Sequence, residues 1–188
     1  KITHYVTTSP AGAWQNEMMF IGDDGDNNSH MRNINANADD IRKMFPGYEI
    51  KKVMFDAYEK TQTSTGEQYA DVETLVNKQI ANGALVMNYG GHASETQLAD
   101  EKMLLLADFK NMRCDNYPLW FTAACETMPF SSLTDNIGKT AILNADGAAV
   151  AFVGTAGTVL EEMNSRINKY FMRYVLSFDD DQPVTIGE

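Results

Sequence analysis

The sequence predicts a three-layer α/β domain, in which helices cover both faces of a mostly parallel sheet of about five strands. Five short apolar segments are bounded by turn-forming residues, a pattern that is typical of buried strands. Segments with apolar residues at helical spacing alternate with them along the chain. This alternation favours parallel strands joined by right-handed helical crossovers, because a parallel sheet is covered on both faces.

The predicted strands come from the apolar segments. A lead-in segment over residues 1–16 carries one edge strand at residues 4–6. The five core strands are predicted, in chain order, at residues 18–22, 50–55, 84–89, 119–124 and 148–153. Aliphatic and aromatic side chains are frequent in these segments, and such side chains pack well on a pleated surface. We therefore expect each of the five to lie inside the sheet.

The predicted helices lie between and after these strands. They are expected, in chain order, at residues 35–45, 70–82, about 102–112, 132–143 and 160–178. Pro46 and Gly47 end the first helix, Gly83 ends the second, and Ser132 is a candidate N-cap of the fourth. Residues 56–66, which are rich in threonine and glycine, are expected to form a loop.

The composition bounds the class of protein. At 188 residues, the chain is long enough for one domain with a full core, over residues 1–188. The net charge of −11 argues against nucleic acid or an anionic membrane surface as a partner, and no apolar run approaches the length of a membrane span. The two cysteines, Cys114 and Cys125, provide no disulfide framework. The chain starts at Lys1 without a signal segment, whereas native chains start with Met, so we expect a processed or excised piece.

Two reactive side chains follow predicted strands. His92 comes after the third core strand and two glycines, Gly90 and Gly91, and Cys125 ends the fourth. Sites in open α/β sheets are assembled at the carboxyl ends of the strands. A lone loop histidine is more often structural, and a free cysteine is more often a small core residue. Together, however, an imidazole and a thiol on adjacent strand ends can act as a general base and a nucleophile.

An acidic loop from Asp23 to Asn28 follows the first core strand. One of its carboxylates could orient His92 as the third member of a triad. Oxygens of Asp23, Asp24 and Asp26 could instead hold Ca²⁺, although the spacing excludes an EF-hand. A solvated acidic turn is the third interpretation, and all three stay open. A zinc site is not expected, because the three histidines and two cysteines are dispersed.

Two segments resemble the sequence motifs of the gingipain family of cysteine peptidases, peptidase family C25. They are Tyr89-Gly90-Gly91-His92-Ala93-Ser94-Glu95 and Leu119-Trp120-Phe121-Thr122-Ala123-Ala124-Cys125. Their separation, 125 − 92 = 33 residues, also resembles the family pattern. Within the family, the chain resembles most the surface sortase branch of the type IX secretion system. The resemblance implies a caspase-like fold, cleavage of peptide bonds through an acyl-enzyme, and a location outside the cell or on the outer-membrane surface.

The resemblance also implies roles for individual residues. Cys125 would be the nucleophile and His92 the general base or acid, with the oxyanion held by the backbone N–H groups of Cys125 and Ala93. The acidic partner of the histidine would be Asp24, with Asp23 next. The implied reaction requires no cofactor, although Ca²⁺ remains a candidate. Its partners would be protein or peptide substrates and other components of a secretion system.

Two further positions follow from the resemblance. His30 and Arg32 fall near the part of the family's fold that shapes the pocket for the residue before the scissile bond.

Two departures from the family pattern leave other functions open. Ala93 stands where the family usually has glycine, and an alanine would be strained there if the position needs a positive φ. The family's catalytic domain also extends beyond the segment seen here. An inactive, peptidase-like binding or scaffolding module is therefore the alternative function. A less favoured alternative is an unrelated α/β domain that binds a small anion at the loop over residues 154–157.

Overall fold

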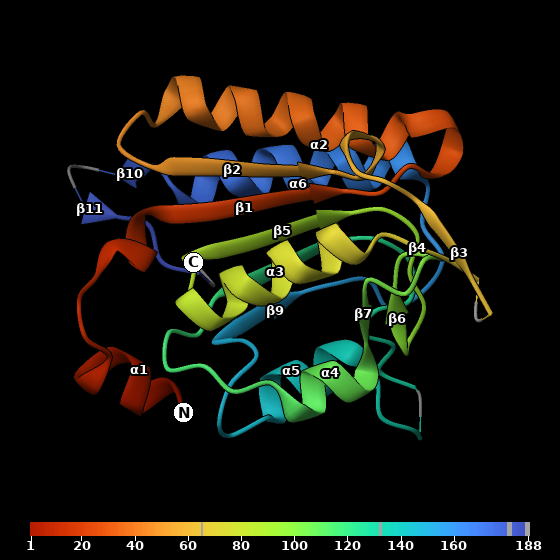
Figure 1. Cartoon of the computed structure of the whole chain (residues 1–188). Helices are drawn as coiled ribbons and strands as arrows, with labels where there is room; N and C mark the ends of the chain where they lie inside the picture. Colours follow the sequence, from red (N-terminus) through yellow and green to blue (C-terminus); the bar gives the residue numbers. More distant parts are fainter. Residues whose placement is uncertain (65, 132, 180–181, 187–188) are drawn as a thin grey trace.

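The computed structural model describes residues 1–64, 66–131, 133–179 and 182–186. Its centre is a five-stranded sheet in the order β2-β1-β5-β8-β9, and each pair of neighbouring strands is parallel. Helices cover both faces of this sheet (Figure 1). The predicted α/β architecture is confirmed.

Each predicted core strand corresponds to one strand of the sheet. In chain order, these are β1 (Glu17–Gly22), β2 (Glu49–Met54), β5 (Val86–Gly90), β8 (Leu119–Ala123) and β9 (Ala151–Val153). β9 begins three residues later than predicted. Ala148 has a φ of 67°, in the left-handed region, so the chain becomes extended only after it.

The two faces of the sheet are covered by different helices. α2 (Gly25–Met44) and α6 (Glu161–Val175) lie on one face, and α3 (Ala70–Asn82), α4 (Leu106–Asn111) and α5 (Ile137–Leu143) lie on the other (Figure 1). Side chains of β1 alternate between them. The cluster on the α2 and α6 side includes Met18, Phe20, Ile34, Ala38, Ile41 and Met172. The cluster on the other side includes Met19, Ile21, Val72, Val76, Phe109 and Ile137. The central strands are therefore buried on both faces.

Residues 4–6, expected as an edge strand, belong instead to α1 (Ile2–Thr8). Tyr5 packs against Trp14 and Tyr117, with ring centroids 6.0 and 6.4 Å apart. Lys1 Nζ donates to the carbonyl oxygens of Asn144 and Gly147, each at 2.7 Å, just beyond α5. These tertiary contacts hold the segment as a helix against its local preference for a strand.

The first helix of the core begins earlier than the predicted residues 35–45. α2 spans Gly25–Met44, so it includes most of the polar segment that was expected to form a loop. Asp26, Asn27 and Asn28 have left-handed φ values of 51°, 54° and 63°, which Asp and Asn tolerate better than most residues. Regular helix follows, with His30 among its buried residues.

Three further boundaries differ from the predictions. α4 starts only at Leu106, because Leu104–Leu105 form β7, which pairs with β6 (Gln97–Leu98). α5 starts at Ile137, and its N-cap is Asn136, whose side chain accepts a 2.9 Å hydrogen bond from the Lys139 N–H. The predicted N-cap, Ser132, lies outside the described residues. α6 ends at Val175, three residues before the predicted end.

The remaining elements are short. They are η1 (Ala13–Asn16), η2 (Phe55–Ala57), the hairpin β3 (Thr61–Thr63) and β4 (Gly66–Gln68), and the pair β10 (Phe178–Asp179) and β11 (Gln182–Pro183). The β3–β4 hairpin occupies part of the expected loop at residues 56–66. Within the described ranges, no helix combines the length and the apolar composition needed to cross a membrane.

Candidate active site

The carboxyl ends of the three central strands lie at one level. The register pairs Gly22 of β1 with Gly90 of β5, and Gly90 with Ala123 of β8. One further residue on each side keeps this order, because Asp23 N–H donates to Gly90 O at 3.2 Å and Gly91 N–H donates to Ala123 O at 3.3 Å. Neighbouring strands lie about 4.8 Å apart. Residues that follow these ends are therefore brought together at one edge.

His92 and Cys125 each lie two residues beyond the aligned pair Gly90 and Ala123. The backbone of His92 is held from both sides. Its N–H donates to Asp23 Oδ2 at 2.6 Å, and its carbonyl oxygen accepts from the Tyr89 hydroxyl at 2.7 Å. The imidazole itself is 41% exposed, so it faces solvent at the edge of the sheet.

The imidazole of His92 lies beside Asp26 and His30. Its Nε2 atom is 3.6 Å from Asp26 Oδ1, and its ring meets the ring of His30 edge to face, with centroids 5.0 Å apart. Gly25 makes this approach possible, because a Cβ there would collide with the His92 ring. The sequence predicts that one carboxylate of this loop orients His92, but it does not indicate that the carboxylate is that of Asp26. Its position at the imidazole depends on the left-handed turn at Asp26–Asn28, which residue spacing does not reveal.

Asp23 is a buried carboxylate that accepts hydrogen bonds from the residues around His92. It is 1% exposed, and besides the His92 N–H it accepts hydrogen bonds from the Tyr89 hydroxyl at 3.0 Å and the Gly25 N–H at 3.2 Å. Burial raises the pKa of Asp23 above its ordinary value, although these donors and the nearby His30 and His92 act to lower it. Asp23 therefore positions backbone around His92 and does not contact the imidazole as its hydrogen-bond acceptor.

Asp24, the residue that the family resemblance pairs with the imidazole, has other partners. Its Oδ2 atom lies 2.7 Å from Lys60 Nζ and accepts a 2.8 Å hydrogen bond from the Tyr69 hydroxyl. Burial, together with this bond to Asp24, raises the pKa of Tyr69 to about 12. Burial acts to raise the pKa of Asp24, but Lys60 and Tyr69 lower it overall. The structure thus brings Asp26, and not Asp24, to Nε2 of His92.

Cys125 is partly buried in a loop that the segment after β9 holds in place. The Val159 N–H points at its Sγ atom at 3.5 Å. The hydroxyl of Thr155 donates to Ala124 O at 2.6 Å, and the N–H of Glu126 donates to Gly157 O at 3.3 Å. The topology could have indicated this contribution, because the loop after β9 follows the strand next to β8.

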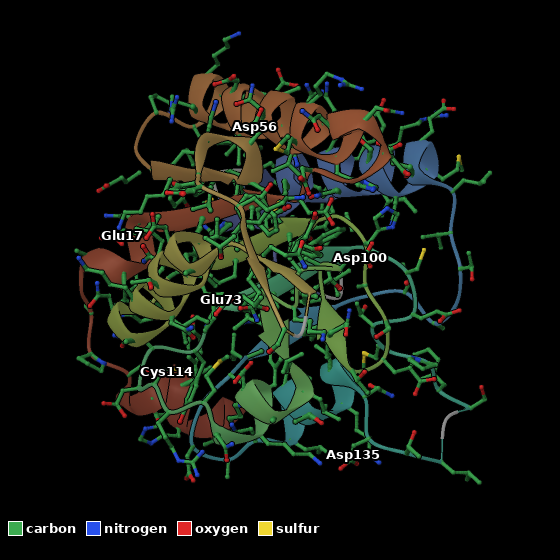
Figure 2. The ribbon with its side chains drawn as sticks, turned by 45° about the vertical axis from the view of Figure 1, so that its right-hand side comes forward. Glu17, Asp56, Glu73, Asp100, Cys114 and Asp135 are labelled. Atoms are coloured by element: carbon green, nitrogen blue, oxygen red, sulfur yellow. The ribbon has the colours of Figure 1, made fainter. Side chains whose placement is uncertain are left out.

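Cys114 lies at the other end of the sheet. Figure 2 places it near α1 and away from Asp100, which directly follows Ala99, the residue whose N–H donates to the His92 carbonyl. Both cysteines are free, in agreement with the absence of a disulfide framework. Burial raises the pKa of the Cys114 thiol.

Ala93 does not have the conformation that would strain an alanine. Its φ is not positive, and it forms an antiparallel bridge with Leu98. The left-handed conformation in this hairpin falls on Ala99 (φ 65°), whose N–H donates to the His92 carbonyl at 2.9 Å. The backbone N–H of Ala93 therefore follows His92 on an extended, unstrained segment.

The two residues expected near the substrate pocket separate. His30 is 8% exposed and contacts both Asp26 and His92, whereas Arg32 points to solvent and donates a 2.7 Å hydrogen bond to Asn27 O. The three carboxylates expected as calcium ligands also face different partners. Asp23 accepts protein donors, Asp24 faces Lys60, and Asp26 faces the imidazoles.

Comparisons with known proteins agree with this fold. A family model described as peptidase family C25 matches residues 1–188. Three solved structures share the fold, with 15 to 21% sequence identity: the Arg-specific cysteine proteinase gingipain R (RgpB; 15%, TM-score 0.67), a protease (21%, TM-score 0.66), and the complex of the pro- and mature domains of Porphyromonas gingivalis RgpB (15%, TM-score 0.72). In the same order, they cover 92, 89 and 95% of this chain.

The chain spans only part of these proteins, namely 40, 35 and 41% of their lengths in the same order. A comparison with curated proteins found no match.

Proposed function

This chain belongs to peptidase family C25, and we propose that it carries the nucleophile and general base of a cysteine-type endopeptidase. The observation that carries this proposal is the register of β5 and β8. It aligns Gly90 with Ala123. His92 and Cys125 therefore follow adjacent parallel strands, each two residues after its member of the aligned pair. A thiol and an imidazole on adjacent strand ends are the minimum needed for acyl transfer.

In the proposed reaction, Cys125 transfers its proton to His92 and attacks the carbonyl carbon of the scissile peptide bond. The backbone N–H groups of Cys125 and Ala93 stabilise the oxyanion that forms. The protonated imidazole then gives its proton to the leaving amine, and an acyl-enzyme remains. Water or an amine releases the acyl group in a second step that uses the same imidazole as base. No cofactor is required for these steps.

We propose Asp26 as the carboxylate that orients His92. Since Asp26 lies at Nε2, Nδ1 is the nitrogen that would exchange a proton with the thiol. The family resemblance points to Asp24, but Lys60 and Tyr69 already engage the one Asp24 oxygen whose contacts are described. Calcium binding by Asp23, Asp24 and Asp26 stays a prediction, and the different partners of the three carboxylates do not favour it.

The sortase branch is the finer assignment that we propose. A PorU-type sortase of the type IX secretion system would cleave exported proteins at the outer-membrane surface and pass the acyl group to an amine. The proposal rests on the motif resemblance, and its partners would be exported protein substrates and other secretion-system components. His30 borders the imidazole and is the better placed of the two pocket candidates, since Arg32 faces away.

The alternative is an inactive, peptidase-like binding module. The contacts of the thiol support it, because the contacts described for Cys125 Sγ go to the main chain of Val159. The substitution of Ala93 for glycine supports it less, given the extended conformation at that position.

Alkylation by iodoacetamide, followed by mass spectrometry of each cysteine peptide, tests the proposal. At pH 6.5, Cys125 should react at least about 10-fold faster than Cys114, because His92 takes up the thiol proton whereas Cys114 is buried. His92→Ala should slow the reaction of Cys125 itself at least about 10-fold, whereas His4→Ala, at the other end of the sheet, should leave its rate unchanged. Equal rates in the wild-type protein would favour the binding module.

A further inference from the structure

A cluster of three potential metal ligands lies at the entrance of the site. Asp26, His30 and His92 each offer one ligand atom, and these atoms lie within 4.8 Å of one another. Asp26 Oδ2 is 3.4 Å from His30 Nε2, and Asp26 Oδ1 is 3.6 Å from His92 Nε2. Three ligands of a tetrahedral zinc ion, bound at 2.0–2.2 Å, are about 3.4 Å apart. The two contacts of Asp26 are therefore close to the separation of zinc ligands, and side-chain adjustments of about 1 Å would bring all three ligand atoms to it.

His30 supplies a second observation that points to a ligand. Its side chain is only 9% exposed, yet its Nε2 atom has no hydrogen-bond partner among the residues that the structure describes. A buried polar atom that lacks a partner costs about 1–3 kcal/mol, so such an atom calls for an explanation. Here it faces the Asp26 carboxylate and the edge of the His92 ring. A bound cation would satisfy it.

The other nitrogen of His30 faces a carboxylate. Nδ1 lies 3.9 Å from Glu161 Oε1, at the start of α6, and the same oxygen accepts a 2.6 Å hydrogen bond from Asn33. A carboxylate behind the distal nitrogen is the usual surrounding of a metal-bound histidine, because it orients the ring and makes the ligand more basic. At 3.9 Å the contact is longer than a hydrogen bond, and Nε2, the other ring nitrogen, lies 3.4 Å from Asp26 Oδ2.

We propose that Asp26, His30 and His92 form a binding site for a divalent transition ion such as Zn²⁺. Two imidazoles and one carboxylate suit this class of ion better than Ca²⁺, which prefers six or more oxygen ligands. The ion would hold His92 through Nε2 and leave a proton on Nδ1, so this imidazole could no longer accept the proton of Cys125. Binding thus reversibly blocks the thiolate step. The binding itself is independent of the proposed peptidase function, whereas the block rests on it.

Zinc affinity, measured by competition with a fluorescent chelator, tests the site. The measurement uses Cys125→Ala protein, so that a thiolate cannot supply the ligand. We expect one Zn²⁺ per chain, and Asp26→Asn or His30→Gln should weaken binding on the order of 100-fold. Asn tolerates the left-handed conformation at position 26 (φ 51°), so Asp26→Asn should fold normally. His4→Gln, on α1, is the matched control and should bind as before.

The absorption spectrum of bound Co²⁺ gives the geometry independently. Intense bands of a tetrahedral site without sulfur charge transfer are expected from Cys125→Ala and from the wild-type protein alike. Loss of binding in Cys125→Ala, with binding retained in Asp26→Asn and His30→Gln, would place the ion on Cys125 and His92 and overturn the proposal. Absence of a tetrahedral Co²⁺ spectrum from both the Cys125→Ala and the wild-type protein would also overturn it.

Alkylation of the wild-type protein separates the two proposals. Zn²⁺ should slow the reaction of Cys125 and leave Cys114 unaffected, and His30→Gln should abolish this effect. If Zn²⁺ binds as expected but Cys125 is already as slow as Cys114 without it, the metal site stands and the peptidase function fails. If Cys125 is fast and Zn²⁺ does not bind, the peptidase function stands and the metal site fails.

Discussion

The backbone N–H of His92 donates a 2.6 Å hydrogen bond to the buried carboxylate of Asp23. This bond ties the loop after β5 to the loop after β1, and the Tyr89 hydroxyl reinforces it by bonding both Asp23 and the His92 carbonyl. The position of the imidazole is therefore set by its own main chain. The contact with the Asp26 side chain then determines only the orientation of the imidazole ring.

Gly91 should be intolerant of any side chain. A Cβ there would collide with the Asp23 carboxylate and the Tyr89 hydroxyl, so Gly91→Ala must break the bonds that hold His92. We expect the free energy of unfolding to fall by about 2–3 kcal/mol, measured by urea denaturation. Gly47→Ala, where a Cβ meets nothing within 4 Å, is the control and should change it by less than about 0.5 kcal/mol. Similar values for the two variants would contradict the packing described around Gly91.

Asp26 and Asp24 should be distinguishable by their effects on the thiol. Asp26→Asn should slow alkylation of Cys125 at pH 6.5 by at least about 10-fold, because the imidazole loses its orienting carboxylate. The difference should vanish well above the ordinary thiol pKa of about 8.5, where no base is needed. Asp24→Asn should leave the rate unchanged and lower stability by about 1 kcal/mol, since it breaks contacts with Lys60 and Tyr69. The reverse pattern would identify Asp24 as the partner.

The fold was predictable from the sequence because its signals are redundant. All five core strands combine apolar composition with flanking turn residues, and Gly83 does end α3, as the helix-stop signal predicted. The prediction of a strand at residues 4–6 was wrong, because contacts of Tyr5 and Lys1 with distant residues override the local strand preference. The predicted start of α2 was wrong, because the sequence of polar residues in a left-handed turn resembles that of an ordinary loop.

Ala93→Gly should bring no gain in reactivity. The position is extended and has no positive φ, so glycine relieves no strain there. Glycine adds flexibility to the unfolded chain and should lower the free energy of unfolding by about 0.5–1 kcal/mol. The measurement is the alkylation rate of Cys125 beside a urea denaturation curve. An increase in rate of 10-fold or more would mean that alanine impairs this site after all.

Glu17 should contribute stability that depends on pH. Its carboxylate accepts hydrogen bonds from Lys51 Nζ at 2.6 Å and from Gln79 at 2.8 Å, and these bonds, that of Lys51 first, lower the pKa of Glu17. A lowered pKa in the folded state means that the stability is present above the unfolded-chain value of about 4.3. It is lost as the pH falls through the lowered, folded-state pKa. Glu17→Gln should therefore cost about 1 kcal/mol at pH 7.

The same substitution should cost progressively less as the pH falls from about 4.3 through the lowered, folded-state pKa, because the wild-type carboxylate then becomes protonated too. Urea denaturation at pH 7 and pH 3 measures the two values. Glu49→Gln is a matched control, because Glu49 is exposed and lies opposite Glu17 in the register of β1 and β2. A cost at pH 3 equal to that at pH 7 would show that Glu17 acts through packing and not through charge.

The candidate site was predictable only in part. His92 and Cys125 follow predicted strands, so their common edge could be inferred from the parallel topology. The contacts of the carboxylates could not be predicted. Asp23, Asp24 and Asp26 are near neighbours in the chain, but their side chains face three different sets of partners. The contact of Val159 with Cys125 also depends on a loop path that no local signal encodes.

The order of the strands has a consequence for when the chain acquires its chemistry. Asp23 and His92 are 69 residues apart, and His92 and Cys125 are 33 apart, so no local stretch contains the site. Contacts of such sequence separation form late and slowly, because closing long loops costs entropy before any contact repays it. An unfolded or half-paired chain would carry a thiol without its base. The proposed pairing of Cys125 with His92 would therefore form only once β5 and β8 lie side by side in the sheet.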